Sequence, residues 1–195
     1  MMRKTVVIML LILLTACQGK TRDLHQEKAG YSFSDWLGAE EAVVLDQIHK
    51  AGIEYEIHDS IHINIYNYLD CHLKEEINGL EYRVNLQFGS WDEEGPSTLQ
   101  LCTRSFECDS WPEDETLEAL QKTLNALCKK YGNPDAVHCQ EDVDVINLYQ
   151  EKTEDQPIHM EWDEGVHLST YYGSGDFRFN WMEMSEDYYS RWGLS

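Results

Sequence analysis

Apolar and polar residues alternate along several segments of the chain, and this period of two most narrows the folds that the sequence can adopt. The segment LEYRVNLQF (80–88) places Leu80, Val84 and Phe88 on one face and charged or amide side chains on the other. Such alternation is typical of a strand in an antiparallel sheet that is buried on one side. We predict further strands in the segments IEYEIH, IHINIYNYL, STLQLCTRSF, DVINLYQ, PIHMEW, VHLSTYY and DFRFNWMEM.

Two other segments repeat their apolar residues at three- and four-residue steps, the spacing of an amphipathic helix. The first lies between Gly38 and Gly52, with Val44 and Ile48 on its apolar face. The order helix, strands, helix, strands predicts an α+β fold, with two amphipathic helices packed on one face of a meandering antiparallel sheet. The second helix lies within residues 112–132, and its apolar positions are Leu117, Leu120, Leu124, Leu127, Cys128 and Tyr131.

The last three strand segments also allow their pairing to be predicted. A turn over residues 163–165 pairs Met160 with Leu168. A two-residue turn over residues 173–174 has glycine first, as a type II′ turn prefers, and it pairs Leu168 with Phe179. Both registers keep the apolar residues on one face, as a half-buried sheet requires.

In this register the opposite face collects polar groups that are able to catalyse hydrolysis. A carboxylate beside a histidine and a serine has the residue types of acid–base or nucleophilic catalysis. Such groups also occur on any solvated sheet face. A hydrolase is therefore an alternative to a non-enzymatic binding protein, which we favour. One predicted row contains Glu161, His167 and Asn180, and the next contains His159, Ser169 and Arg178. The candidate catalytic residues are His159, Glu161, His167, Ser169 and Arg178.

A second group of histidines raises the question of a metal site. His58 and His62 are four residues apart, so an unbroken strand would place them on one face, with His72 further along. Asp59 and Ser60 favour a break between them, and the β-rich segment lacks the helix that an HxxxH zinc site needs. The sequence also contains no phosphate-binding glycine loop, nucleophile elbow or dinucleotide fingerprint. We predict no metal and no cofactor.

The first residues have the pattern of a secretory leader. Arg3 and Lys4 precede an uncharged apolar run, residues 6–14. This run is shorter than the roughly 20 apolar residues of a membrane-spanning helix and matches the core of a signal peptide. The sequence LTAC (14–17) follows directly, with a large aliphatic residue, two small residues and a cysteine. It resembles the lipobox of bacterial lipoproteins.

The resemblance implies that residues 1–16 are removed as a signal peptide and that Cys17 begins the mature protein. Cys17 then carries a diacylglycerol thioether on sulfur and a further acyl chain, such as palmitate, on its amine. The protein is anchored by lipid in the cell envelope, and Gln18 in place of an acidic residue favours the outer membrane or another extracytoplasmic face. Residues 17–30 are a polar tether and residues 31–195 a single α+β domain.

The mature part carries a second, looser likeness. The segment LQKTLNALCKKYGNP, followed by IHMEW and FRFNW, resembles small envelope lipoproteins of unknown function. In these proteins an amphipathic helix ending in KYG-x-P precedes a hairpin with a buried tryptophan. The likeness implies no active site, so we expect a binding or envelope-maintenance module. A passive structural component of the envelope is a further alternative.

Charge and cysteine content limit the partners and the cross-links. The formal net charge is -21, which argues against nucleic acid and anionic lipid surfaces as ligands and is compatible with a basic protein partner. An envelope location permits disulfides. With Cys17 lipidated, the remaining cysteines are odd in number and cannot all pair within one chain. They are Cys71, Cys102, Cys108, Cys128 and Cys139.

Overall fold

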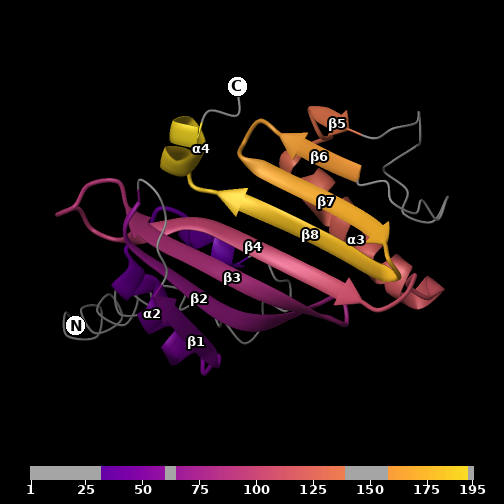
Figure 1. Cartoon of the computed structure of the whole chain (residues 1–195), viewed down its shortest axis with the longest axis horizontal. Helices are drawn as coiled ribbons and strands as arrows, with labels where there is room; N and C mark the ends of the chain where they lie inside the picture. Colours follow the sequence, from indigo (N-terminus) through magenta and orange to yellow (C-terminus); the bar gives the residue numbers. More distant parts are fainter. Residues whose placement is uncertain (1–31, 60–64, 139–157, 193–195) are drawn as a thin grey trace, which may run out of the picture.

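The computed structural model describes residues 32–59, 65–138 and 158–192 as an α+β fold, built on one eight-stranded sheet in which neighbouring strands are antiparallel (Figure 1). The strands are β1 (Tyr55–Asp59), β2 (Tyr66–Ile77), β3 (Leu80–Ser90), β4 (Thr98–Cys108), β5 (Ala136–His138), β6 (Ile158–Trp162), β7 (Val166–Gly173) and β8 (Asp176–Met184). The helices are the 3₁₀-helix η1 (Ser32–Trp36) and the α-helices α2 (Glu41–Lys50), α3 (Asp114–Tyr131) and α4 (Glu186–Trp192).

The sheet consists of two meanders that meet in the middle. Its strand order is β1-β2-β3-β4-β8-β7-β6-β5, so β4 and β8 form the central pair. Each meander follows one helix in the chain: α2 precedes β1 to β4, and α3 precedes β5 to β8. The predicted order of helix, strands, helix, strands is therefore confirmed, and the β4–β8 pairing joins the two halves.

Helix α3 forms where the sequence predicts it, because each of its ends has a local signal. Acidic Asp114 and Glu115 occupy the first turn, and Lys129 and Lys130 occupy the last, so both ends complement the helix dipole. Gly132 then takes a φ of 86°, which other residues rarely adopt, and its N–H donates to the Cys128 carbonyl at 2.9 Å.

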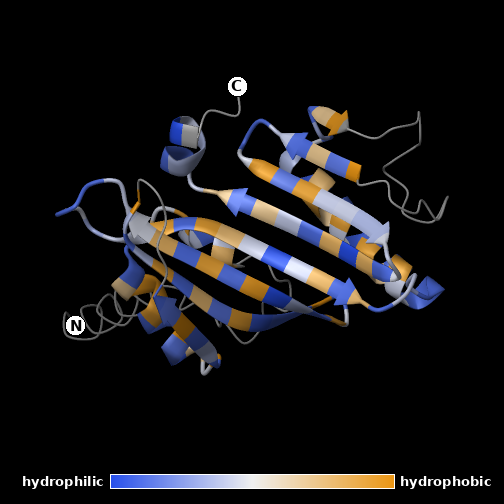
Figure 2. Cartoon of the chain, viewed as in Figure 1, coloured by the Kyte–Doolittle hydropathy of each residue, from blue (hydrophilic) through white to orange (hydrophobic). Residues whose placement is uncertain are grey.

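The apolar residues divide into two clusters, one for each meander. The alternating apolar and polar bands are visible along the strands in Figure 2. The cluster of the first meander receives Val44 and Ile48 from α2, and it contains Cys71, Leu73, Val84, Leu86, Phe88, Leu99 and Cys102. The cluster of the second meander receives Leu120, Leu124 and Leu127 from α3, and it contains Met160, Trp162, Val166, Leu168, Phe177, Phe179 and Trp181.

Two predictions about strands need correction. The predicted strand over residues 61–69 is longer at its end than predicted: β2 includes residues 66–69 and continues to Ile77, because the charged residues that follow face solvent or pair with other charges. Residues 60–64 lie outside the described ranges. The β6–β7 register is as predicted, with Met160 opposite Leu168. The predicted β7–β8 register is wrong by two residues. In the structure Leu168 lies opposite Trp181 instead of Phe179, and the turn is formed by residues 174–175.

Some predictions concern segments that the structure does not describe. The predicted strand DVINLYQ lies within residues 139–157, and the leader and tether lie within residues 1–31. Helix α4, strand β5 and η1 were not predicted, since each is too short to show a periodic pattern. Across the described ranges, no helix has both the length and the apolar character that a membrane crossing requires.

Candidate functional site

One side of the sheet carries a continuous polar surface, which we call the polar face. Cross-strand partners lie on the same side of a sheet, so the register identifies its members. From β3 to β7 they include Asn85 opposite Thr103, Ser105 opposite Asn180, and Asn180 opposite Ser169.

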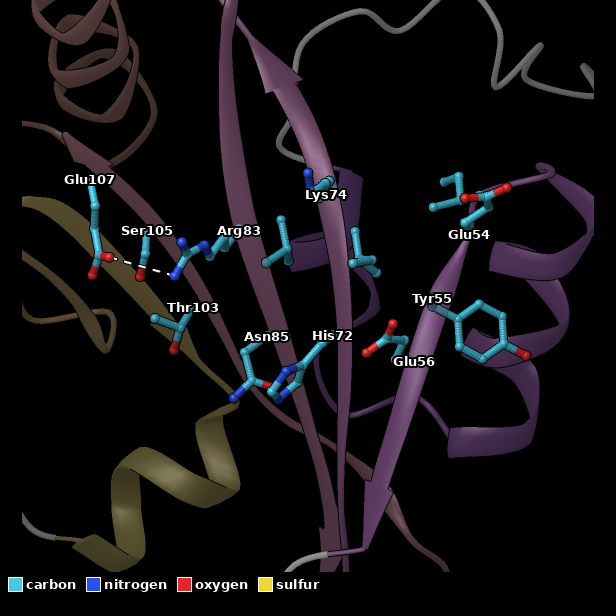
Figure 3. Close-up of a pocket in the computed structure, with 13 residues that line it drawn as sticks. Glu54, Tyr55, Glu56, His72, Lys74, Arg83, Asn85, Thr103, Ser105 and Glu107 are labelled. Atoms are coloured by element: carbon cyan, nitrogen blue, oxygen red, sulfur yellow. Dashed lines mark ion pairs between the residues drawn. The ribbon is translucent and has the colours of Figure 1, made fainter. Parts of the chain in front are cut away.

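The polar face is hollowed over the first meander. The hollow has a volume of about 1200 Å³, and Figure 3 shows side chains from β2, β3 and β4 extending into it. Its floor contains half-buried neutral side chains, and its rim contains exposed charged ones. The polar residues that line it are Glu54, Tyr55, Glu56, His72, Lys74, Arg83, Asn85, Thr103, Ser105 and Glu107.

The two cations of the hollow already have carboxylate partners. Lys74 Nζ lies 2.7 Å from Glu81 Oε1, and Arg83 Nη1 lies 3.5 Å from Glu107 Oε2. The other oxygen of Glu107 lies 3.9 Å from Arg178 Nε on β8. These pairs are exposed, so they contribute little to stability, but they neutralise the rim locally.

The predicted catalytic residues occupy the polar face of the second meander, although not in the predicted rows. Glu161 and His167 are cross-strand partners, with 3.8 Å between Oε1 and Nδ1. The row of His167 continues to Met182 rather than to Asn180, because the β7–β8 turn is displaced.

The second predicted row is also changed. Ser169 lies between His159 on β6 and Asn180 on β8. Arg178 lies opposite Tyr171 and leaves the row altogether. His159 and Arg178 are exposed, whereas His167 and Ser169 are half-buried.

His167 has the chemistry of a neutral imidazole. Burial lowers the pKa of His167, and the carboxylate of Glu161 opposes that shift only in part. The Nε2 atom is buried and has no hydrogen-bond partner among the described residues. A neutral imidazole beside a carboxylate has the residue types of a general base, but the 3.8 Å between the two side chains is longer than a hydrogen bond and Nε2 is buried. None of the five candidate catalytic residues lines the hollow.

The predicted pairing of His58 with His62 stays a prediction, because His62 lies outside the described residues. His58 instead approaches His72, with 4.8 Å between the ring centroids. Glu56 Oε2 lies 3.6 Å from His58 Nε2. Within the described ranges, no group of at least three histidine, cysteine or acidic side chains has metal-binding geometry.

A buried ionic cluster that the sequence reasoning missed lies where the two meanders join. Arg104 on β4 is 0% exposed; its Nε donates to Glu75 at 2.9 Å and its Nη1 donates to Glu183 at 2.7 Å. Its guanidinium carbon also lies 5.2 Å from the ring centroid of Trp181. The alternation signal could have found this cluster, because Arg104 and Glu183 both occupy inward positions of their strands.

The C-terminal end of α3 and Ser34 of η1 contribute further groups to the ionic cluster. Lys130 Nζ lies 3.2 Å from Glu183 Oε1, and the Tyr131 hydroxyl donates to the same oxygen. Burial alone would raise the pKa of Glu183. The charge of Arg104 and the hydrogen bond from Tyr131 outweigh it, so the pKa is held below its usual value. Glu183 is therefore an ionised carboxylate that ties α3 to the sheet.

Of the described cysteines, two are buried and two are half-buried. Cys71, Cys102, Cys108 and Cys128 form no disulfide with one another. Burial raises the pKa of the Cys71 thiol to about 11 and that of Cys102 to about 12, so neither is an activated nucleophile. Cys17 lies outside the described residues, so its lipidation stays a prediction, as does any pairing of Cys139.

Comparison with known proteins adds no relative: no family model matches the chain, and neither a curated protein nor a solved structure is significantly similar to it. The two features of the described residues that bear on function are the hollowed polar face and the Glu161–His167 pair.

Proposed function

We propose that the chain is a lipid-anchored binding module of the cell envelope that presents the polar face of its sheet to a ligand. The observation that carries this proposal is the hollow of about 1200 Å³ over the first meander, with a half-buried neutral floor and a charged rim. A concave polar surface on a rigid sheet is suited to recognition, because its side chains are held in fixed positions.

We infer further that both amphipathic helices lie on the other side of the sheet, which leaves the polar face uncovered. Leu86, in the cluster of α2, lies opposite Cys102. Cys102 lies opposite Glu183, and Glu183 lies opposite Val166, which belongs to the cluster of α3. Successive cross-strand partners share one side of a sheet, so the two apolar clusters share a side.

The lipid anchor supplies the location in this proposal. Lipidation of Cys17 would hold the domain at the outer membrane or another extracytoplasmic surface, and two or more acyl chains give stable anchoring. Labelling of cells with a fatty-acid probe should tag the full chain and leave Cys17→Ala untagged. Equal labelling of the two proteins would refute the lipid anchor but would not bear on the proposed binding site.

The binding site is tested separately by photo-crosslinking in cells. A photoreactive residue replaces Arg83 on the rim of the hollow, or Lys122 on the exposed surface of α3 as the matched control. The proposal expects a crosslinked species from position 83 that is lost when Asn180→Trp blocks the neighbouring part of the polar face. Identical crosslinking from both positions would refute it and would favour a passive envelope component. A basic protein as the crosslinked species would identify the partner class that the acidity of the chain favours.

A hydrolase is the second candidate, and the Glu161–His167 pair favours it. The half-buried histidine, its carboxylate partner and the nearby Ser169 have the residue types of a nucleophilic site. In that case the full chain hydrolyses a simple ester such as p-nitrophenyl acetate, and both His167→Gln and Ser169→Ala abolish the activity. Activity that survives both substitutions would eliminate this candidate.

A further inference from the structure

The charges and neutral groups of the polar face are distributed in a way that indicates the class of its ligand. Arg83 pairs with Glu107, which also lies near Arg178, and the exposed carboxylates of Glu54 and Glu56 line the same hollow, so the rim mixes both signs of charge. Lys74 likewise pairs with Glu81. A charged ligand would have to compete with these existing pairs, whereas a neutral one would not.

The floor of the polar face offers neutral hydrogen-bonding groups instead. Asn85 and Thr103 are cross-strand partners within the hollow. The row of Ser105 continues through Asn180 to Ser169, beyond the hollow and across the junction of the two meanders. All five side chains are half-buried, so they are fixed more firmly than the rim.

Two of these groups have unused acceptors. Asn85 Nδ2 donates to Asp70 at 3.2 Å, but the Oδ1 atom of Asn85 is buried and has no donor among the described residues. The Oδ1 atom of Asn180 is in the same condition. A buried acceptor without a donor is unfavourable, and a ligand hydroxyl that reaches it would supply the missing donor.

We propose that the polar face binds a neutral oligosaccharide that crosses the strands from β3 to β7. Asn85 on β3 and Ser169 on β7 belong to two adjacent rows and are three inter-strand steps apart, about 14 Å across the strands at the usual spacing. The ligand is therefore an extended chain of several sugars rather than a single one. Its hydroxyls bond to the amide and hydroxyl groups of Asn85, Thr103, Ser105, Asn180 and Ser169. This inference rests on the proposed function and specifies its ligand.

Titration calorimetry on the full chain tests the ligand class. The protein is kept in lauryldimethylamine oxide, because a sugar-based detergent would compete for the site. The probes are tetra-N-acetylchitotetraose and cellotetraose as neutral chains, tetragalacturonate as the anionic chain and tetralysine as the cationic one. We expect a neutral tetramer to bind with a Kd below about 1 mM and at least about tenfold more tightly than either charged probe. Its affinity should be the same at about 50 and 200 mM salt, since no ion pair forms.

Two matched substitutions locate the site. Asn180→Ala should weaken binding of the neutral tetramer about 3- to 10-fold, the loss of one or two hydrogen bonds. Asn125→Ala, on the exposed surface of α3, should leave the Kd unchanged. Thermal unfolding of both variants verifies that each is folded.

The outcomes separate this inference from the proposed function. The proposal of an oligosaccharide ligand is overturned if neither neutral tetramer binds. It is also overturned if Asn180→Ala and the wild-type chain bind the neutral tetramer equally. Salt-sensitive binding of tetralysine alone overturns it as well, but it leaves a binding module with a basic ligand. Absence of position-specific crosslinking at residue 83 would instead refute the proposal that the protein is a binding module.

Discussion

Replacement of Arg104 by methionine should strongly destabilise the domain, because it leaves a buried carboxylate without its main partner. Arg104 is fully buried and makes charge-assisted hydrogen bonds of 2.9 Å to Glu75 and 2.7 Å to Glu183. Removal of one member of a buried ion pair typically costs about 3–5 kcal/mol. Glu183 retains Lys130 and Tyr131 as partners, so we expect the lower end, about 3 kcal/mol. This is a large share of the roughly 5–15 kcal/mol that stabilises a domain of this size.

Urea unfolding, followed by tryptophan fluorescence, measures the loss. Adding Glu183→Gln to Arg104→Met should recover part of it, since the uncompensated buried charge is then gone while the hydrogen-bond acceptor remains. The control is Arg191→Met: this arginine is 52% exposed, pairs with Asp187 on the same helix, and should cost less than about 1 kcal/mol.

The dependence on pH gives a second check with a definite sign. In the wild-type protein the pKa of Glu183 is lowered, so its stabilising contribution is present at neutral pH and is lost as the pH falls through the folded-state pKa. Without Arg104, burial still raises the pKa of Glu183, and only Tyr131, Lys130 and Ser34 are left to lower it, so the pKa is higher than in the wild-type protein. The deficit of Arg104→Met should therefore shrink as the pH falls below neutral, because Glu183 takes up a proton at a higher pH in the variant than in the wild-type protein. A deficit below about 1 kcal/mol at pH 7, or one that grows on acidification, would refute this reasoning.

Three further predictions concern single positions. Because burial lowers its pKa, His167 should titrate below the usual histidine range in an NMR pH series, and a value at or above about 6.5 would contradict its buried position. Leu120→Ala should cost about 2–5 kcal/mol in urea unfolding because the side chain is 0% exposed, whereas Val43→Ala, at a position 52% exposed, should cost less than about 0.5 kcal/mol; equal costs would contradict the packing of α3. Gly175→Ala should cost about 1–2 kcal/mol, since the residue has a φ of 91°, and a neutral effect would contradict the turn geometry.

The elements that the sequence predicts correctly carry their own signals. Helix α3 has an apolar stripe, acidic residues at its start and lysines before Gly132, so its extent depends little on the rest of the chain. The continuation of β2 to Ile77 has no such signal. Its segment DCHLKEEI is charged. Glu75 occupies an inward position of the strand, and its charge is compensated there by Arg104 on β4. Tertiary contact therefore decides the secondary structure there.

The ionic cluster could have been predicted from the alternation pattern, because two of its charged residues stand at inward strand positions. Arg104 stands between Cys102 and Phe106 at inward positions of β4, and Glu183 continues the inward series of β8 after Trp181. A charged residue at an inward position demands a partner of opposite sign, because an unpaired buried charge is prohibitive. Opposite charges at inward positions therefore predict that the side chains meet on the same side of the sheet. Arg104 meets Glu183 on the adjacent strand β8 and Glu75 on β2, which lies beyond β3.

The β7–β8 register marks the limit of the same pattern. A shift of two residues preserves which side chains face the core, so alternation cannot distinguish the two pairings, and only the turn decides between them. Ser174 and Gly175 have φ values of 55° and 91°, the two positive angles of a type I′ turn, whose twist matches that of the flanking strands. The shift changes the chemistry of the polar face: Ser169 gains Asn180 as its neighbour and loses Arg178. A neutral amide in place of a cation beside this serine favours recognition of a neutral ligand over stabilisation of a developing negative charge.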